Sequence, residues 1–139
     1  MYSFEVASKK HNSSVQRLLL QLGYSSVEED IIKFLELQNS NSEVLVIIFD
    51  SQVVGLISLV YYDYFPLQRK ICRITSVVIE ESFRGKGIGR KVMDLACERA
   101  RDNDCHKLEV TTSLARKKTH KFYESFGFKK SSFRYAIDL

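Results

Sequence analysis

The segment 77–90 constrains the fold of this 139-residue chain more than any other part of the sequence. The β-branched run Val77-Val78-Ile79 is followed by a loop with glycine at positions 85, 87 and 89, and an amphipathic pattern begins directly after it. This order predicts a strand, a turn with little side-chain bulk and a helix N-terminus. Glycine lets a ligand approach the backbone closely, and the free N–H groups that begin a helix attract anions. We therefore expect a phosphate-binding turn.

The composition predicts one domain over residues 1–139. Hydrophobic residues make up 45% and charged residues 27%, and the single proline and the lack of low-complexity tracts leave no candidate linker. Three scattered cysteines favour neither a disulfide framework nor a zinc site, so we expect no metal and a cytoplasmic location. No signal-peptide pattern and no membrane-spanning apolar run is present in the sequence, so we expect no membrane partner.

The spacing of apolar residues predicts the element order β-α-α-β-β-β-α-β-α-β-β. We expect strands at 2–7, 44–49, 53–62, 69–79 and 107–112, helices at 15–22, 26–35, 88–101 and 117–126, and two short strands within 128–138. A hairpin-linked block followed by a βαβ crossover predicts an α/β fold, with a mixed, mostly antiparallel sheet and helices on both faces.

The glycine spacing distinguishes three kinds of phosphate loop. A triphosphate P-loop requires Ser or Thr after its Gly-Lys pair, but Gly87 follows Lys86 here. A dinucleotide loop requires a small residue at the position of Arg90, where helix and strand pack closely. The pyrophosphate loop of acyl-CoA-dependent N-acetyltransferases is the third kind, and its spacing agrees.

Over nearly its whole length the chain resembles the GNAT superfamily of N-acetyltransferases. Arg84, Gly87 and Gly89 match the family loop Arg/Gln-x-x-Gly-x-Gly/Ala, and the segment 122–128 matches its aromatic-Tyr-x-x-x-Gly-Phe pattern. The resemblance implies a GNAT-like fold and direct transfer of an acetyl group from acetyl-CoA to a primary amine of a small molecule, in a ternary complex. A weaker similarity to small bacterial aminoglycoside 6′-N-acetyltransferases implies an aminoglycoside-like acceptor.

The resemblance also assigns the contacts with acetyl-CoA. The pantetheine arm would pair with Val77–Ile79, in a gap between that strand and 108–111, and a backbone N–H near Val78 would polarise the thioester. Arg116 stands where many relatives have Asn, so it either contacts the 3′-phosphate or is a solvated helix start. The implied contact set is Val77, Val78, Ile79, Arg84, Gly85, Lys86, Gly87, Ile88, Gly89, Arg90, Arg116 and Tyr123.

Direct acetyl transfer requires a base for the amine and a proton for the leaving thiolate. Tyr123 matches the general-acid tyrosine of the family, and an ordinary packed aromatic is the alternative. Glu109 is the first candidate base because of its place on the strand after the loop helix, and Glu80 is the second. A solvated strand charge is the alternative for both. No cysteine stands in a pattern that favours an acyl-cysteine route.

Other functions stay open at this point. The acceptor could be a protein N-terminal or lysine amine, and a non-catalytic CoA sensor is a further alternative. The net charge of +4 also suits a nucleic-acid-binding module, but no nucleic-acid motif is present in the sequence, which disfavours that class. A homodimer through edge strands or helices is a further prediction.

Overall fold

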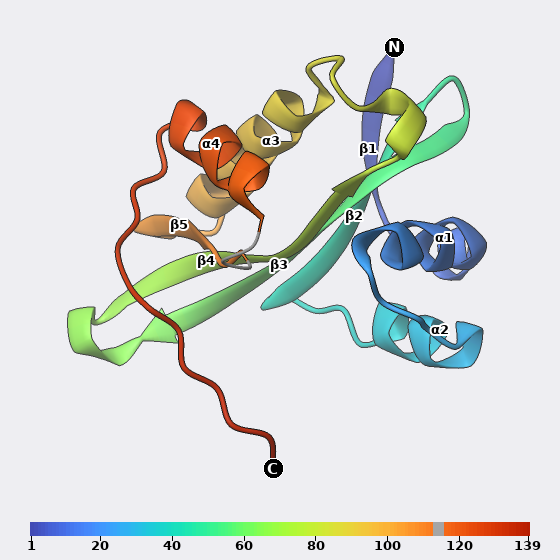
Figure 1. Ribbon diagram of the computed structural model, residues 1–139. Coiled ribbons are helices and arrows are strands. Elements are labelled where there is room, and N and C mark those ends of the chain that lie inside the picture. The colour runs from blue at the N-terminus through green and yellow to red at the C-terminus, as the bar shows by residue number, and fades with distance from the viewer. Residues whose placement is uncertain (113–115) are drawn as a thin grey trace.

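The computed structural model spans residues 1–139 and describes 1–112 and 116–139. Five strands form one sheet in the order β1-β2-β3-β4-β5 (Figure 1). The strands are β1 (Tyr2–Val6), β2 (Ser42–Phe49), β3 (Gln52–Tyr64), β4 (Arg69–Ile79) and β5 (Lys107–Val110). The helices are α1 (Asn12–Leu22), α2 (Glu28–Glu36), α3 (Ile88–Asp102) and α4 (Lys117–Phe126). The strands β1 to β4 are antiparallel, and β5 runs parallel to β4, so the predicted mixed α/β class is confirmed.

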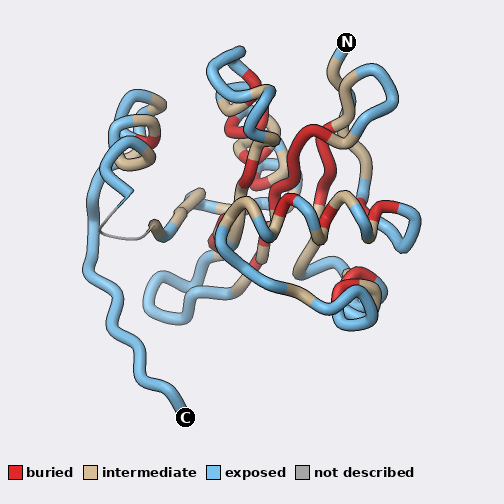
Figure 2. Tube along the Cα trace, turned by 45° about the vertical axis from the view of Figure 1, so that its right-hand side comes forward, coloured by how far each residue is buried: buried red, intermediate tan, exposed pale blue. Residues whose placement is uncertain are grey.

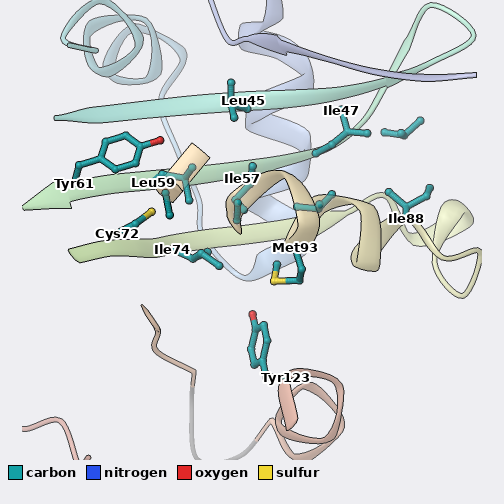
Figure 3. Close-up of a cluster of buried hydrophobic side chains, with 14 residues drawn as sticks. Leu45, Ile47, Ile57, Leu59, Tyr61, Cys72, Ile74, Ile88, Met93 and Tyr123 are labelled. Atoms are coloured by element: carbon teal, nitrogen blue, oxygen red, sulfur yellow. The ribbon is translucent and has the colours of Figure 1, made fainter. Parts of the chain in front are cut away.

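Helices cover both faces of the sheet, with α1 and α2 on one face and α3 and α4 on the other (Figure 1). The face beneath α3 and α4 carries a core that includes Ile57, Leu59, Cys72, Ile74 and Met93 (Figure 3). A smaller core lies under α1 and α2, where the buried residues are Ala7, Val15, Leu18, Ile31, Leu35, Val46, Leu56 and Val78. Buried positions therefore concentrate in the central strands and the helix faces against them (Figure 2).

A β-bulge interrupts the pairing of β3 with β4. Ser58 pairs with Ser76 and Leu59 with Ile74, so Thr75 is one extra residue on β4. A bulge bends its strand and increases the local twist. The parallel partner β5 pairs with β4 only from Ile71 to Ile74, which is the residue before the bulge. The two strands therefore separate where β4 bends.

The C-terminal segment differs from the sequence prediction. The two short strands expected within 128–138 are absent, and the chain after α4 is extended and largely exposed. In Figure 1 this tail leaves α4 and ends well away from the sheet. The prediction was wrong because alternating apolar residues indicate a strand, but a strand also needs a partner edge within reach. Within the described part of the chain, no helix has the length and apolar character needed to span a bilayer.

Candidate functional site

The predicted phosphate loop connects β4 to α3 and depends on glycine at two positions. After Ile79 the chain makes a 3₁₀ turn (Glu81–Phe83), and Gly85 and Gly87 then adopt φ angles of 77° and 82°. Side chains disfavour this left-handed region, whereas glycine enters it freely. Space is open where a Cβ of either glycine would lie, with no atom within 4 Å. The backbone at the start of α3 is therefore accessible to a ligand.

The charges around the start of α3 favour an anion. The positive end of a helix dipole is normally balanced by acidic residues in the first turn, but α3 has none there. Basic side chains surround it instead. Arg90 stacks on the ring of Phe126 at 5.4 Å and the Lys86 ammonium lies 5.0 Å from the ring of Phe83. This uncompensated positive charge, together with the free N–H groups, makes the loop a suitable binding site for a phosphate group.

Arg84 contributes to the shape of the loop. Its Nε donates a hydrogen bond of 2.9 Å to the carbonyl oxygen of Ile79, which holds the turn against the end of β4. Gly89 sets the spacing between α3 and α4, because an added Cβ would lie 3.2 Å from the ring of Phe122. A side chain at this position would push α4 away from the loop helix.

Tyr123 is buried on α4, and its phenol points toward Met93 and the sheet (Figure 3). Its ring packs edge-on against Phe122 and Phe128, with centroids 5.6 Å and 5.5 Å away. Burial raises the pKa of the phenol above its ordinary value, and the charge of Arg116 opposes that shift more weakly. Tyr123 is therefore protonated at neutral pH and can donate a proton.

The outer edge of β4 is open from Thr75 to Ile79. This segment pairs with β3 on one side, and no described strand pairs with its other side. A gap between β4 and β5 is therefore present beyond Ile74 and Val110. It is shorter than predicted, because Leu108 and Glu109 still pair with β4. Alternate residues of an unpaired edge present free N–H and C=O groups, which an extended amide-bearing ligand can satisfy.

Glu109 lies on the opposite face of the sheet from Tyr123. Its neighbours Leu108 and Val110 pack against the core under α3, so the Glu109 side chain points to the α1/α2 face. Arg73 donates a hydrogen bond of 2.7 Å from Nε to Glu109, and the hydroxyl of Tyr62 donates to the same carboxylate. Burial raises the pKa of Tyr62, and so does the hydrogen bond that its hydroxyl donates to Glu109. The three residues form a polar network beside the fork between β4 and β5.

The bulge places three hydroxyl groups together on the same face. The Oγ of Ser58 lies 2.6 Å from the Oγ1 of Thr75 and is also hydrogen-bonded to Ser76. These residues form part of the wall of a pocket of about 590 Å³ between the sheet and α1 and α2. Asp30 and Glu43 also line the pocket. The wall is otherwise mostly apolar, and the pocket meets β4 at Thr75 and Ser76.

Glu80 lies far from Glu109. It accepts hydrogen bonds from Gln21 at 2.8 Å and Arg17 at 3.3 Å, which tie the end of β4 to α1. It borders a second pocket of about 630 Å³. Glu109 pairs with Arg73, seven residues before Glu80, so the backbones at Glu109 and Glu80 lie roughly 20 Å apart along β4 at ~3.3 Å per residue. They cannot act together on one amine.

Arg116 connects the two helical layers. Its Nη2 donates a hydrogen bond of 3.0 Å to the carbonyl oxygen of Leu22, the last residue of α1. The start of α4 is thereby fixed to the end of α1.

The loop and the open edge are adjacent because the loop follows β4 directly, and Tyr123 belongs to the core under α3. The structure separates the two candidate bases. The polar partners Tyr62 and Arg73 and the hydroxyl cluster at Thr75 were missed. One signal for the cluster was present, since Thr75-Ser76 interrupts the apolar run of the strand 69–79.

The model of the acetyltransferase (GNAT) family matches residues 12–128. The aminoalkylphosphonate N-acetyltransferase of Salmonella typhimurium is 32% identical over 90 residues, which cover 65% of this chain and 58% of that protein. The glucosamine 6-phosphate N-acetyltransferase of Trypanosoma brucei brucei is 34% identical over 90 residues, which cover 63% of this chain and 58% of that protein. Each match thus spans less than two thirds of the relative's length.

A solved structure supports the same fold. The aminoglycoside N-acetyltransferase AAC(6')-Iy, in complex with CoA, superimposes with a TM-score of 0.88 at 14% identity, covering 100% of this chain and 95% of that one. At this identity the likeness concerns the fold alone.

The raised pKa of Tyr123 predicts how stability changes with pH. The folded protein holds the phenolic proton to higher pH than the unfolded chain does. Above pH ~10, where the unfolded chain releases this proton, the free energy of unfolding therefore falls as the pH rises. The fall is at most about 1.4 kcal/mol per pH unit. Denaturant titrations should show a steeper loss above pH ~10 in the wild type than in Tyr123→Phe. Tyr24→Phe, which removes an exposed phenol, is the matched control. Equal slopes in the wild type and Tyr123→Phe contradict this prediction.

Proposed function

This chain belongs to the acetyltransferase (GNAT) family, and we propose that it transfers an acetyl group from acetyl-CoA to a primary amine of a small molecule. The observation that carries the proposal is the combination of a glycine loop at a basic helix start with an unpaired strand edge leading into it. Acetyl-CoA has a pyrophosphate and a chain of amides. The glycine loop matches the pyrophosphate, and the unpaired edge that leads into it matches the amides.

The residues of the loop and edge suit the donor. Backbone N–H groups from Gly85 to Arg90 would hold the pyrophosphate, with Lys86 and Arg90 adding charge. The edge from Val77 to Ile79 would pair with the pantetheine amides, and a backbone N–H near Val78 would stabilise negative charge on the thioester oxygen. Bound acetyl-CoA supplies the acetyl group as an activated thioester.

Tyr123 and a carboxylate would move the two protons of the reaction. As the amine nitrogen bonds to the acetyl carbon and the C–S bond breaks, Tyr123 gives its proton to the sulfur. Glu109, on the acceptor side of the fork, would take the proton from the amine. The hydroxyls of Thr75 and Ser76 lie on β4 between Val78 and Arg73, so they or a water would relay that proton. Glu80, two residues from Val78, is the alternative base.

The acceptor is proposed to carry an anionic phosphorus group besides its amine. The two relatives described above are named for aminoalkylphosphonates and glucosamine 6-phosphate, which share this pair of groups. The Arg73 guanidinium pairs with Glu109 on the proposed acceptor side, and arginine suits phosphate oxygens. These points favour such an acceptor over an aminoglycoside or a protein amine.

Thiol release from acetyl-CoA tests the acceptor class directly. We expect 2-aminoethylphosphonate or glucosamine 6-phosphate to give a kcat/KM at least about tenfold above ethylamine or glucosamine, because one charge-assisted contact is worth about 1.4 kcal/mol or more. Aminoglycosides and lysine peptides complete the panel. A higher kcat/KM with an aminoglycoside or a lysine peptide would overturn the acceptor proposal. If no amine caused thiol release, the proposal that this protein is an acetyltransferase would be overturned.

Gly87→Glu tests the donor site. A carboxylate at the start of α3 repels the pyrophosphate, so we expect the affinity for acetyl-CoA in calorimetry to fall by about 100-fold or more. Gly23→Glu is the matched control, because Gly23 also has a positive φ, of 106°, and open space around its Cβ position. Unchanged affinity in Gly87→Glu, or an equal loss in both variants, argues against the assigned loop.

Tyr123→Phe tests the general acid. The variant keeps the packed ring and loses the proton donor, so kcat should fall by about 100-fold while acetyl-CoA affinity stays unchanged. Ser125→Ala removes an exposed hydroxyl from the same helix and serves as a control. A kcat equal to that of the wild type would remove Tyr123 from the mechanism.

A further inference from the structure

Arg73 and Glu109 form an ion pair that is open to solvent. The Nε of Arg73 donates a hydrogen bond of 2.7 Å to Oε1 of Glu109, and Nη2 lies 2.7 Å from the same oxygen. The side chains are 38% and 34% exposed, so a small molecule can reach both charges. Arginine binds an anion most strongly when two of its N–H groups meet two different oxygens. An anion with several oxygens can therefore compete with Glu109 for this guanidinium.

The ion pair opposes the action of Glu109 as a base. A carboxylate that accepts a proton loses its charge, and the guanidinium of Arg73 would then lie 2.7 Å from a neutral group. Removing one charge of a pair is unfavourable, and partial exposure reduces this cost without abolishing it. Glu109 is therefore free to take a proton only when another anion has replaced it beside Arg73.

The charges of this pair are complementary to those of the proposed acceptor. Near neutral pH an amine with a phosphorus group carries an ammonium at one end and an anion at the other. A phosphate group has a charge of about −1.5 to −2 at pH 7, which is more than the single charge of a carboxylate, and three oxygens to share. The acceptor can therefore replace one ion pair by two, with its anion on Arg73 and its ammonium on Glu109.

We propose that the acceptor opens the Arg73–Glu109 pair by this exchange and so frees its own base. The inference rests on the proposed function, because it requires an amine that also carries an anionic phosphorus group. Glu109 takes one proton from the ammonium nitrogen and passes it to water, and the neutral amine then attacks the thioester as described above. The hydroxyl of Tyr62 also donates to Glu109, so it holds the carboxylate in position after Arg73 has turned to the acceptor.

The position of the pair limits the length of the acceptor. Thr75 stands two residues after Arg73 on β4, so their backbones lie roughly 7 Å apart at ~3.3 Å per residue. The exchange also begins from two side chains in direct contact. Both points favour a short spacer between nitrogen and phosphorus. We therefore expect 2-aminoethylphosphonate to react faster than glucosamine 6-phosphate, in which the two groups lie further apart.

Two separate molecules that supply the two charges test the exchange. Methylphosphonate provides the anion, and ethylamine provides an amine without one. At saturating acetyl-CoA, we expect methylphosphonate to raise the wild-type kcat/KM for ethylamine by about tenfold, because it withdraws Arg73 from Glu109. In Arg73→Leu no pair has to be opened, so ethylamine alone should react about tenfold faster than with the wild type, and methylphosphonate should add nothing.

Arg69→Leu is the matched control for Arg73→Leu. It removes an exposed arginine of the same strand whose guanidinium contacts His106 instead of Glu109, so it should behave as the wild type does. Calorimetry with methylphosphonate alone measures the anion site without turnover, and Arg73→Leu should bind it at least about tenfold more weakly than Arg69→Leu. Tyr62→Phe should lower kcat for 2-aminoethylphosphonate and leave its KM unchanged, as expected of a positioning residue. Circular dichroism verifies that the variants are folded.

The outcomes separate this inference from the proposed function. An ethylamine rate that Arg73→Leu leaves unchanged or lowers would overturn the exchange, and so would a lack of activation by methylphosphonate. In either case a wild type that still prefers 2-aminoethylphosphonate to ethylamine keeps its proposed function. If no amine caused thiol release, both the exchange and the proposed function would be overturned.

Discussion

The extra residue in β4 is the constraint on which the rest of the site depends. With Thr75 inserted opposite the Ser58–Leu59 step, β4 bends and leaves the direction of β5 after Ile74. A continuous sheet would satisfy every backbone group between these strands and leave no room for a ligand. The bulge therefore produces the open edge from Thr75 to Ile79. It also brings hydroxyl groups to the α1/α2 face, where they line a pocket.

The loop after β4 depends on the same arrangement from its other end. Gly85 and Gly87 turn the chain so that α3 starts beside the open edge, and the absence of a Cβ at Gly89 allows α4 to approach closely enough for Phe122 to contact α3. This contact holds Tyr123 against the core of the sheet. The exposed backbone of the proposed anion site and the close packing around Tyr123 thus both depend on the glycines at 85, 87 and 89.

Local features were predictable from the sequence and distant pairings were not. The predicted bounds of the strand 69–79 and the helix 117–126 agree with β4 and α4, because apolar periodicity is a property of neighbouring residues. The network of Tyr62, Arg73 and Glu109 joins residues up to 47 positions apart, and its geometry depends on a register that the bulge shifts. The periodicity of apolar residues does not reveal where one strand carries an extra residue relative to its partner.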